Sequence, residues 1–256
     1  MNEKILLEAE NITKIYNLGT KNPLKAIKDI SLKVHVGEFL CIMGPSGSGK
    51  STLLNNISTI DLPTKGKVFI NNKEITTMSE KEIGEFRYKN LGFIFQNYNL
   101  LEALTIYENI ATPLSLQGYN SSEIHNKILE TSQKLKIENI LDKYPSECSG
   151  GQKQRVAIVR ALVTNPKMIV ADEPTGNLDS KNSHELLMVL KKLNEEQNIT
   201  IIMVTHDAQI ASYSSKILFI KDGVINQILE KKDMSQKEYY YKIVNMNLSK
   251  SQKLFI

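Results

Sequence analysis

The sequence predicts an α/β protein with a buried parallel sheet, whose strand ends carry the functional groups. Three short and almost wholly apolar runs support this fold class: Phe39–Met43, Met168–Ala171 and Ile199–Val204. Each gives way abruptly to glycine or polar residues, as expected for a strand covered on both faces. Because ligands of such sheets bind beyond the carboxyl ends of the strands, the residues after these runs are the first candidates for a site.

A phosphate-binding loop follows the first run. The stretch from Gly44 to Thr52 reads GPSGSGKST and fits the pattern G-x-x-x-x-G-K-[ST], and Leu53-Leu54 then open a helix. The glycines let backbone N–H groups surround a phosphate, and the helix adds its positive N-terminal end. A glycine- and serine-rich turn that binds nothing is the alternative. We expect the nucleotide-binding residues to be Gly44, Ser46, Gly47, Gly49, Lys50, Ser51 and Thr52.

Lys50 and Ser51 have separate expected roles in this loop. Lys50 should reach the β- and γ-phosphates of the nucleotide, and the Ser51 hydroxyl should ligate Mg²⁺. The loop alone identifies only a nucleotide phosphate site, because kinases, GTPases and motor ATPases share it.

Composition excludes several other classes. The chain has 256 residues, of which 41% are hydrophobic and 23% charged, and its net charge of +4 comes without a long basic run. Nucleic acid is therefore not an expected partner, while the charge is compatible with attraction to an anionic inner membrane surface. No apolar run approaches the ~20 residues of a membrane span, and no signal peptide is apparent, so we expect a cytosolic chain. Cys41 and Cys148 suggest neither a disulfide framework nor a metal site.

The N-terminal part predicts a strand-rich platform. Partial alternation over Ile5–Ile12, over Ala26–Val34 and over Gly66–Asn72 is typical of half-buried antiparallel strands. Tyr16 follows the first of these. Its ring offers a stacking platform for a purine base, and a surface tyrosine at a strand end is an equally good interpretation.

The middle of the chain predicts helices. Helical spacing runs over Glu80–Asn90 and over Ser121–Ile137, and we expect a helix over Thr105–Leu116 that is interrupted at Pro113. Between the first two helices lies the strand Leu91–Phe95, which ends on the polar amide of Gln96.

A second anion-binding helix start is predicted at Ser149. Ser149-Gly150-Gly151-Gln152 leads into the strong helix former Lys153–Leu162, and offers a hydroxyl and bare backbone amides. An ordinary helix cap is the alternative.

Two further strand ends deliver ionisable groups. Asp172 and Glu173 end the second apolar run, and adjacent strand residues point to opposite sides, so we expect Asp172 to ligate Mg²⁺ and Glu173 to activate water. The turn-rich loop that follows carries a third carboxylate, Asp179. His206 follows the third run and is expected to contact the γ-phosphate. His35, His125 and His184 are interpreted as surface or structural, and Asp222-Gly223 as a hairpin turn.

Together these motifs resemble ATP-binding cassette (ABC) ATPases. The order GPSGSGKST, Gln96, SGGQ, the Met168–Glu173 strand, Asn177-Leu178-Asp179 and His206 is the order of that family, and other phosphate-loop families lack SGGQ. The resemblance implies a P-loop NTPase cassette with a RecA-like core, an N-terminal antiparallel β subdomain and a helical subdomain. Its ATP-binding domain would cover residues 1–228, with the helical subdomain at about 97–162, and a C-terminal helical extension would cover 229–256.

The resemblance also implies how the site is assembled. Two cassettes would meet head to tail, so that each ATP lies between one chain's phosphate loop and the other chain's Ser149, Gly150, Gly151 and Gln152. Tyr16 would stack on adenine, Gln96 would link Mg²⁺, the attacking water and the membrane subunit, and Asp179 would act across the interface. Many members have Leu at the position of Cys148. Because Cys is a small hydrophobe, we expect altered packing there and an active site nonetheless.

A narrower resemblance concerns the transported substrate. Residues 57–64, 91–101 and 173–180 are similar to the macrolide-exporter and lipoprotein-release branch, and within it to bacitracin-export ATPases of antimicrobial-peptide resistance. This similarity implies a separate permease at the cytoplasmic face of the cell membrane. A regulatory module that dimerises on ATP to signal without transport remains an alternative. A soluble nucleic-acid ATPase is disfavoured, since no coiled-coil insertion or second cassette is present. The segment Lys231–Ile256 is expected to be a packing helix or a partner contact.

Overall fold

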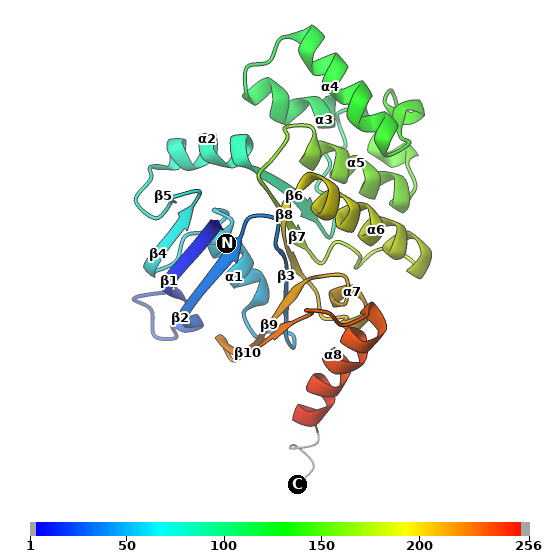
Figure 1. Cartoon of the computed structure of the whole chain (residues 1–256). Helices are drawn as coiled ribbons and strands as arrows, with labels where there is room; N and C mark the ends of the chain where they lie inside the picture. Colours follow the sequence, from blue (N-terminus) through cyan, green and yellow to red (C-terminus); the bar gives the residue numbers. More distant parts are fainter. Residues whose placement is uncertain (1–3, 252–256) are drawn as a thin grey trace.

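The computed structural model describes residues 4–251, and from residue 247 onward it describes the backbone alone. The described residues form a six-stranded sheet in the order β10-β9-β3-β8-β7-β6 and a four-stranded sheet in the order β2-β1-β4-β5 (Figure 1). The strands of the larger sheet are β3 (Phe39–Met43), β6 (Leu91–Phe95), β7 (Met168–Asp172), β8 (Thr200–Val204), β9 (Lys216–Lys221) and β10 (Val224–Glu230). This is the α/β fold that the sequence predicts.

The three predicted apolar strands lie side by side in the middle of the larger sheet. β3, β7 and β8 are parallel, and every residue of β3 and β8 is buried. Ile42 and Asp172 both pair with Val204, so the carboxyl ends of the three strands lie level. The residues that follow them, Gly44, Glu173 and Thr205, therefore meet at one edge of the sheet.

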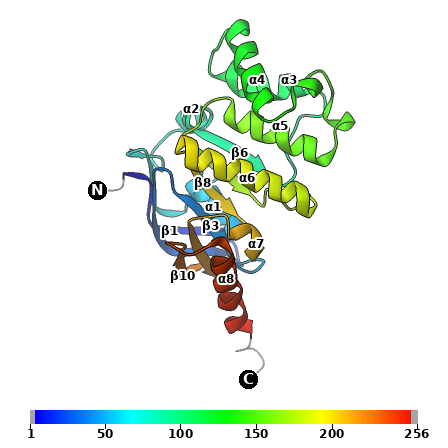
Figure 2. The ribbon, with the colours of Figure 1, turned by 45° about the vertical axis from the view of Figure 1, so that its right-hand side comes forward.

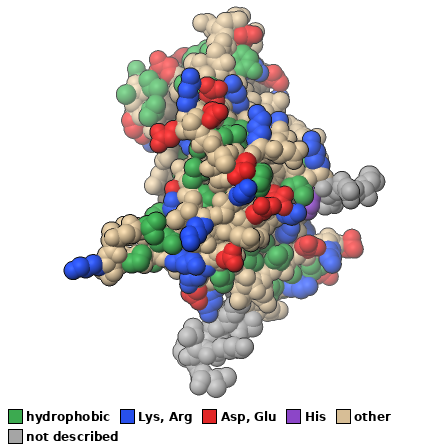
Figure 3. Space-filling view, turned by 90° about the vertical axis from the view of Figure 1, so that its left-hand side faces the viewer, with side chains coloured by type: hydrophobic (Ala, Val, Ile, Leu, Met, Phe, Trp, Pro, Cys, Tyr) green, Lys and Arg blue, Asp and Glu red, His purple; other side chains and the backbone are tan. Residues whose placement is uncertain are grey.

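The smaller sheet is antiparallel and contains longer strands than the alternation predicts. Its strands are β1 (Ile5–Tyr16), β2 (Leu24–His35), β4 (Lys65–Ile70) and β5 (Lys73–Glu74). Irregularities in the β1–β2 register, with left-handed φ values of 49° at Asn11 and 54° at Asp29, shift the alternation without ending the pairing. On the face of the molecule that carries this sheet, positive and negative side chains are interspersed (Figure 3).

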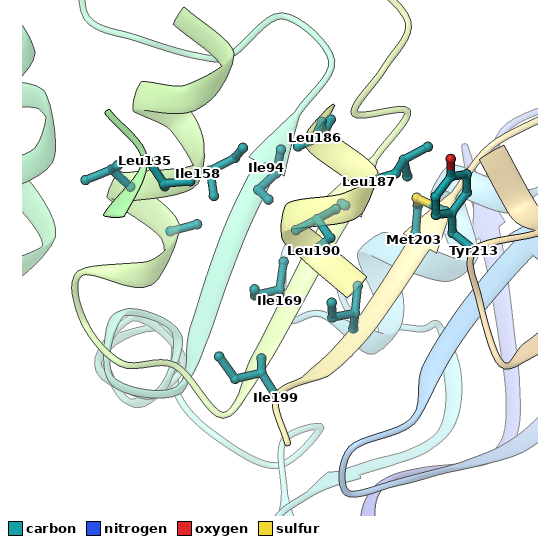
Figure 4. Packing of buried hydrophobic residues seen from close by; sticks show 14 of the residues in the cluster. Ile94, Leu135, Ile158, Ile169, Leu186, Leu187, Leu190, Ile199, Met203 and Tyr213 are labelled. Carbon is teal, nitrogen blue, oxygen red and sulfur yellow. The ribbon is translucent and has the colours of Figure 1, made fainter. Parts of the chain in front are cut away.

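Helices cover the larger sheet and form two cores. The helices are α1 (Lys50–Ile57), α2 (Glu80–Asn90), α3 (Ile106–Leu116), α4 (Ser121–Lys134), α5 (Gly150–Leu162), α6 (Ser180–Gln197), α7 (Ala208–Ala211) and α8 (Gln236–Ser251), with short 3-10 turns η1 (Glu138–Ile140) and η2 (Pro145–Glu147). One core lies between the sheet and α5 and α6, where Ile94, Ile169 and Leu190 pack together (Figure 4). The other joins α1 and the antiparallel sheet to the opposite face of the larger sheet.

Two helical expectations need correction. α3 runs through Pro113 without interruption, because Ile110 and Leu114 on either side are fully buried and hold the helix in place. α4 ends at Lys134 and not at Ile137, because Lys136 adopts a left-handed φ of 55°.

The C-terminal segment packs as one of its two interpretations predicts. α8 leaves the body of the molecule at the end opposite α3 and α4 (Figures 1 and 2), yet Tyr239 and Ile243 at its start are fully buried. Residues 252–256 of the predicted extension, and residues 1–3 of the predicted domain, lie outside the described residues. Within residues 4–251, none of the helices combines the length and the apolar character required to cross a bilayer.

Candidate nucleotide-binding and catalytic site

The phosphate loop joins the buried strand β3 to α1, as the sequence predicts. Gly49 occupies the N-cap position of α1 with φ 100°, a conformation that favours glycine. A Cβ at this position would lie 2.7 Å from the carbonyl oxygen of Ala26, so the loop is closely packed on β2. Since Gly49 has no side chain, it leaves the first amides of α1 available to an anion.

Two polar groups in this loop fit a bound polyphosphate. Lys50 is 8% exposed, and its Nζ donates to the carbonyl oxygen of Pro45 at 3.0 Å, which leaves its other N–H groups for a ligand. Ser48 Oγ is buried and has no hydrogen-bond partner within the described part of the chain. An ammonium and an unpaired hydroxyl inside a loop of backbone donors are the groups that a polyphosphate requires.

Ser51 and Asp172 come together as the predicted oxygen ligands of a metal ion. The Ser51 hydroxyl donates to Asp172 Oδ1 at 3.3 Å. Burial, with a smaller contribution from the charge of Glu173, raises the pKa of Asp172, while the Ser51 hydrogen bond and the Lys50 charge oppose this shift. Hard oxygen donors of this kind suit Mg²⁺.

Gln96 lies beside this pair at the end of β6. Phe95 pairs with Asp172, so Gln96 follows at the neighbouring strand end. Its amide group packs against Gly176, where a Cβ would lie 2.7 Å from Gln96 Nε2. The described residues contain no cluster of three or more His, Cys, Asp or Glu side chains suited to a metal. A Mg²⁺ ion here would therefore need phosphate or water oxygens as its remaining ligands, as is usual for nucleotide sites.

Glu173 and His206 form a hydrogen-bonded pair at the same sheet edge. His206 Nδ1 lies 3.1 Å from Glu173 Oε1, and the two side chains are 69% and 25% exposed. Glu173 has a left-handed φ of 43°, an uncommon conformation for a residue with a side chain. β7 ends at Asp172, so Glu173 lies in this turn and not on the strand. The adjacent carboxylates have different neighbours because of the turn, and not because of the strand alternation that the sequence analysis expected.

The second motif forms a separate hollow. Ser149 caps α5: its Oγ accepts from the Gln152 N–H at 3.3 Å, and Gln152 Oε1 accepts from the Ser149 N–H at 2.8 Å. A hollow of about 430 Å³ opens in front of this cap. It is lined by Ser149, Gly150, Gly151, Gln152, Arg155, Asn177, Leu178, Asp179 and Asn182.

Asp179 shares this hollow and also begins α6. Its carboxylate accepts from the Asn182 N–H at 2.8 Å, and this hydrogen bond lowers the pKa of Asp179. None of the described lining residues comes from the phosphate loop. The predicted residues thus fall into two groups within one chain: the phosphate loop with the three strand ends, and the Ser149 hollow with Asp179.

Tyr16 lies at the end of β1, near the phosphate loop. It pairs with Leu24 of β2, two residues before Ala26, whose carbonyl oxygen faces Gly49. The β1–β2 pairing therefore places Tyr16 at the end of the sheet next to the segment that packs on the loop, and its side chain is half-buried. Both sequence interpretations are compatible with this position.

Arg160 is a candidate that the sequence analysis missed. Its guanidinium donates to the carbonyl oxygens of Tyr98 and Asn99, the residues of the loop after Gln96, and its burial lowers its pKa. It thereby ties that loop to α5, the helix that Ser149 begins. The signal available in the sequence was an arginine among apolar residues of a predicted helix.

Comparison with known proteins identifies the family. Residues 27–176 match the family model described as ABC transporter, and the chain belongs to that family. It is an ATP-binding and ATP-hydrolysing subunit of a membrane ABC transporter.

Individual relatives agree with the predicted branch. The bacitracin export ATP-binding protein BceA of Halalkalibacterium halodurans is 49% identical over 240 residues, covering 93% of this chain and 94% of BceA. The macrolide export ATP-binding/permease protein MacB of Syntrophobacter fumaroxidans is 42% identical over 222 residues, covering 86% of this chain and 31% of MacB.

Among solved structures, the ATP-binding cassette MJ0796 of Methanocaldococcus jannaschii, a dimer in a post-hydrolysis state bound to ADP and Pi, superposes with a TM-score of 0.83. It is 39% identical, and the superposition covers 90% of this chain and all of the MJ0796 chain, 100%.

Proposed function

We propose that two copies of this chain close head to tail on ATP and thereby drive a separate membrane permease. The observation that carries the proposal is the division of the site residues into two groups. The Ser149 hollow offers a hydroxyl and bare amides, and none of its described lining residues comes from the phosphate loop of the same chain. A second chain would complete each site, and the dimeric MJ0796 cassette supports this arrangement.

Within each site, the residues around the phosphate loop would perform hydrolysis. Lys50 would neutralise charge on the β- and γ-phosphates, while Ser51, Asp172 and Gln96 would hold Mg²⁺. When bound, Mg²⁺ supplies positive charge to the phosphate oxygens.

Glu173 accepts a proton from the attacking water, or orients that water, and His206 contacts the γ-phosphate. The hydrogen bond between the two side chains keeps both at the phosphate-facing edge of the sheet.

The partner chain would supply the remaining contacts. The Ser149 hydroxyl and the amides of Gly150 and Gly151 would donate to the γ-phosphate, and Gln152 and Asp179 would lie at the same interface. The start of α5 is suited to this role because its N-terminal amides favour an anion.

The permease would bind beside the Gln96 loop. A largely apolar groove of about 640 Å³ lies there between α2, β6, α3 and α5, with Phe95, Leu101 and Arg160 in its lining. Because Arg160 bonds to the loop after Gln96, movement of a permease segment in this groove would reach both that loop and α5, the helix that begins at Ser149. This assignment would place the subunit at the cytoplasmic face of the membrane.

We further propose that the transported molecule is a peptide antibiotic of the bacitracin type, the substrate that the name of the relative BceA gives. The test is to express the chain together with the permease that co-purifies with it in a bacitracin-sensitive host. Resistance that is lost with Lys50→Ala supports the proposal. Unchanged sensitivity, with the complex assembled and hydrolysing ATP, would reject this substrate class.

The closing step is tested with Glu173→Gln. This variant should bind ATP normally, slow phosphate release by about 10²-fold or more, and sediment as a dimer with ATP and Mg²⁺. Lys50→Ala is the matched control, since it should stay monomeric and inactive. A Glu173→Gln chain that remains monomeric at saturating ATP, even with its permease present, would contradict the proposal.

A further inference from the structure

The ring of Tyr16 is held from two sides by charged residues. Its hydroxyl donates to Asp61 Oδ2 at 3.2 Å. Lys14 Nζ lies 2.6 Å from the other carboxylate oxygen, Asp61 Oδ1, and donates to the carbonyl oxygen of Leu62 at 2.7 Å. The same ammonium lies over the Tyr16 ring, 5.2 Å from its centroid. One face of the ring is thus covered by a cation.

Asp61 is in turn fixed to α1, the helix that the phosphate loop begins. Its backbone N–H donates to the carbonyl oxygen of Asn55 at 3.2 Å, and Asn56 Nδ2 donates to the Asp61 carbonyl oxygen at 3.3 Å. Asn56 is buried, 1% exposed. The carboxylate that binds Tyr16 therefore belongs to the same rigid unit as the phosphate loop.

The residues after Asp61 join this unit to β1 directly. The Thr64 N–H donates to the carbonyl oxygen of Thr13 at 2.8 Å, and the Ile15 N–H donates to Thr64 Oγ1 at 2.9 Å. Thr64 thus bonds to the backbone of β1 on both sides of Lys14, once through its own backbone and once through its side chain. The carboxylate of Asp61 in addition contacts the Tyr16 hydroxyl and the Lys14 ammonium.

We propose that Asp61, with Lys14, is a positioning residue that sets the distance between the base platform and the phosphate cradle. The inference rests on the proposed role of Tyr16 as the surface on which the base stacks. A nucleotide can use both contacts only if the ring and the loop are the correct distance apart. Holding the ring before binding removes the entropic cost of ordering it afterwards. Since Lys14 covers one face, the base stacks on the opposite face.

The contacts of the Asp61 carboxylate predict a measurable effect of its removal on nucleotide affinity. The Lys14–Asp61 pair is partly shielded, with side chains 13% and 35% exposed, so Asp61→Asn, which removes the negative charge, should weaken the contacts of both the ring hydroxyl and the ammonium with residue 61. A hydrogen bond to a carboxylate contributes enough free energy that its loss should weaken binding of the base by about five- to tenfold. Binding of the phosphates alone should not change.

Magnesium ADP and inorganic pyrophosphate separate these two contributions, because only ADP carries a base and neither is hydrolysed. The dissociation constants of both are measured by calorimetry, or by competition, for the full chain and for Asp61→Asn, Tyr16→Phe and the double variant. We expect each single variant to raise the Kd of ADP about five- to tenfold, with the Kd of pyrophosphate unchanged. The double variant should bind ADP no more weakly than Asp61→Asn alone, because Tyr16→Phe removes a bond that Asp61→Asn already weakens.

Two controls make the outcome decisive. Glu8→Gln removes the charge from another ion pair of the same sheet, Lys33–Glu8 at 2.8 Å, and should leave both constants unchanged. An unchanged Kd for ADP in Asp61→Asn, or an equal loss of pyrophosphate binding, would overturn the positioning role. Tyr16→Ala tests the underlying assignment separately: if it binds ADP normally, the base platform itself is rejected.

Discussion

At the scale of single residues, the surroundings of Asp172 disfavour the ionised form of its carboxylate. It is half-buried next to Glu173, and both burial and that neighbour raise its pKa. A protein without a function for this carboxylate would be more stable with a neutral group there. The unfavourable charge is consistent with the proposed Mg²⁺ site, because a bound cation would favour the ionised carboxylate of Asp172.

Asp172→Asn should therefore stabilise the nucleotide-free protein at neutral pH while abolishing hydrolysis. Because the folded-state pKa of Asp172 is raised, its protonated form stabilises the fold below the unfolded-state pKa, and this contribution is lost as pH rises through the folded-state pKa. Asp172→Asn has no ionisable group at this position, so it does not lose this stability as pH rises. Urea unfolding at a series of pH values should show a stability advantage of Asp172→Asn that grows with pH above the ordinary aspartate range. An advantage that shrinks as pH rises would contradict the assignment.

Some residue-scale features could be predicted from sequence and others could not. The positions of Lys50, Ser51 and Asp172 could be predicted, because the motifs around these residues fix the local backbone that carries them. Asp61 and Arg160 were not, because their partners lie 45 and 62 residues away, at Tyr16 and Tyr98, and only the folded chain brings these pairs together.

At the scale of elements, the two candidate anion-binding helix starts differ in how they are capped. α1 begins at a glycine, whereas α5 begins at Ser149, whose hydroxyl accepts a 3.3 Å bond from Gln152. The same reciprocal capping begins α4 at Asn120, where the bond from the Glu123 N–H is 3.0 Å. α4 lies outside the proposed site, so it provides a control for the structural part of the role of Ser149.

Ser149→Ala and Asn120→Ala should have similar effects on stability and different effects on activity. Each removes a helix cap and should cost about 0.5–2 kcal/mol of unfolding free energy, measured in urea. Only Ser149→Ala should also reduce phosphate release, by about 10²-fold, because it removes a donor to the developing charge. Equal activity of the two variants would show that Ser149 is a cap and nothing more.

The C-terminal helix α8 provides a second element-scale test. Tyr239 is fully buried and its hydroxyl donates to the carbonyl oxygen of Leu229 at 3.1 Å, whereas the nearby Tyr241 is 54% exposed. Tyr239→Ala should lower the unfolding free energy by about 3–5 kcal/mol, and Tyr241→Ala by less than about 0.5 kcal/mol. Equal effects in chemical denaturation would mean that α8 does not pack as described.

Element boundaries followed from the sequence only where local signals decided them. α2 was predicted at its observed bounds from the helical spacing of its charged and apolar residues, and in the structure a capping box of Ser79 and Glu82 stabilises its start. The length of β1 was underestimated because irregular pairing breaks the alternation, and the continuity of α3 through Pro113 depends on burial of its neighbours. Those factors are tertiary and leave no local pattern.

At the scale of the whole molecule, the parallel sheet explains why residues far apart in sequence form one site. β3, β7 and β8 end level, so the phosphate loop, Asp172-Glu173 and Thr205-His206 share an edge. The order of these strands is not evident from the apolar runs alone. The order of the motifs along the chain predicted no order of strands within the sheet, which comes from the folded structure. The described fold agrees with that of the family.

The central claim is that the binding site for a nucleotide held by the phosphate loop of one chain is completed by Ser149–Gln152 of the other chain. The most direct measurement uses an ATP analogue with a photoreactive group on its γ-phosphate. It is bound to a mixture of unlabelled Glu173→Gln chain and isotopically heavy chain that carries both Glu173→Gln and Lys50→Ala, so that the nucleotide occupies the unlabelled phosphate loop. We expect the cross-linked peptides to include the heavy peptide that contains Ser149. Cross-links confined to peptides of the unlabelled chain would contradict the claim.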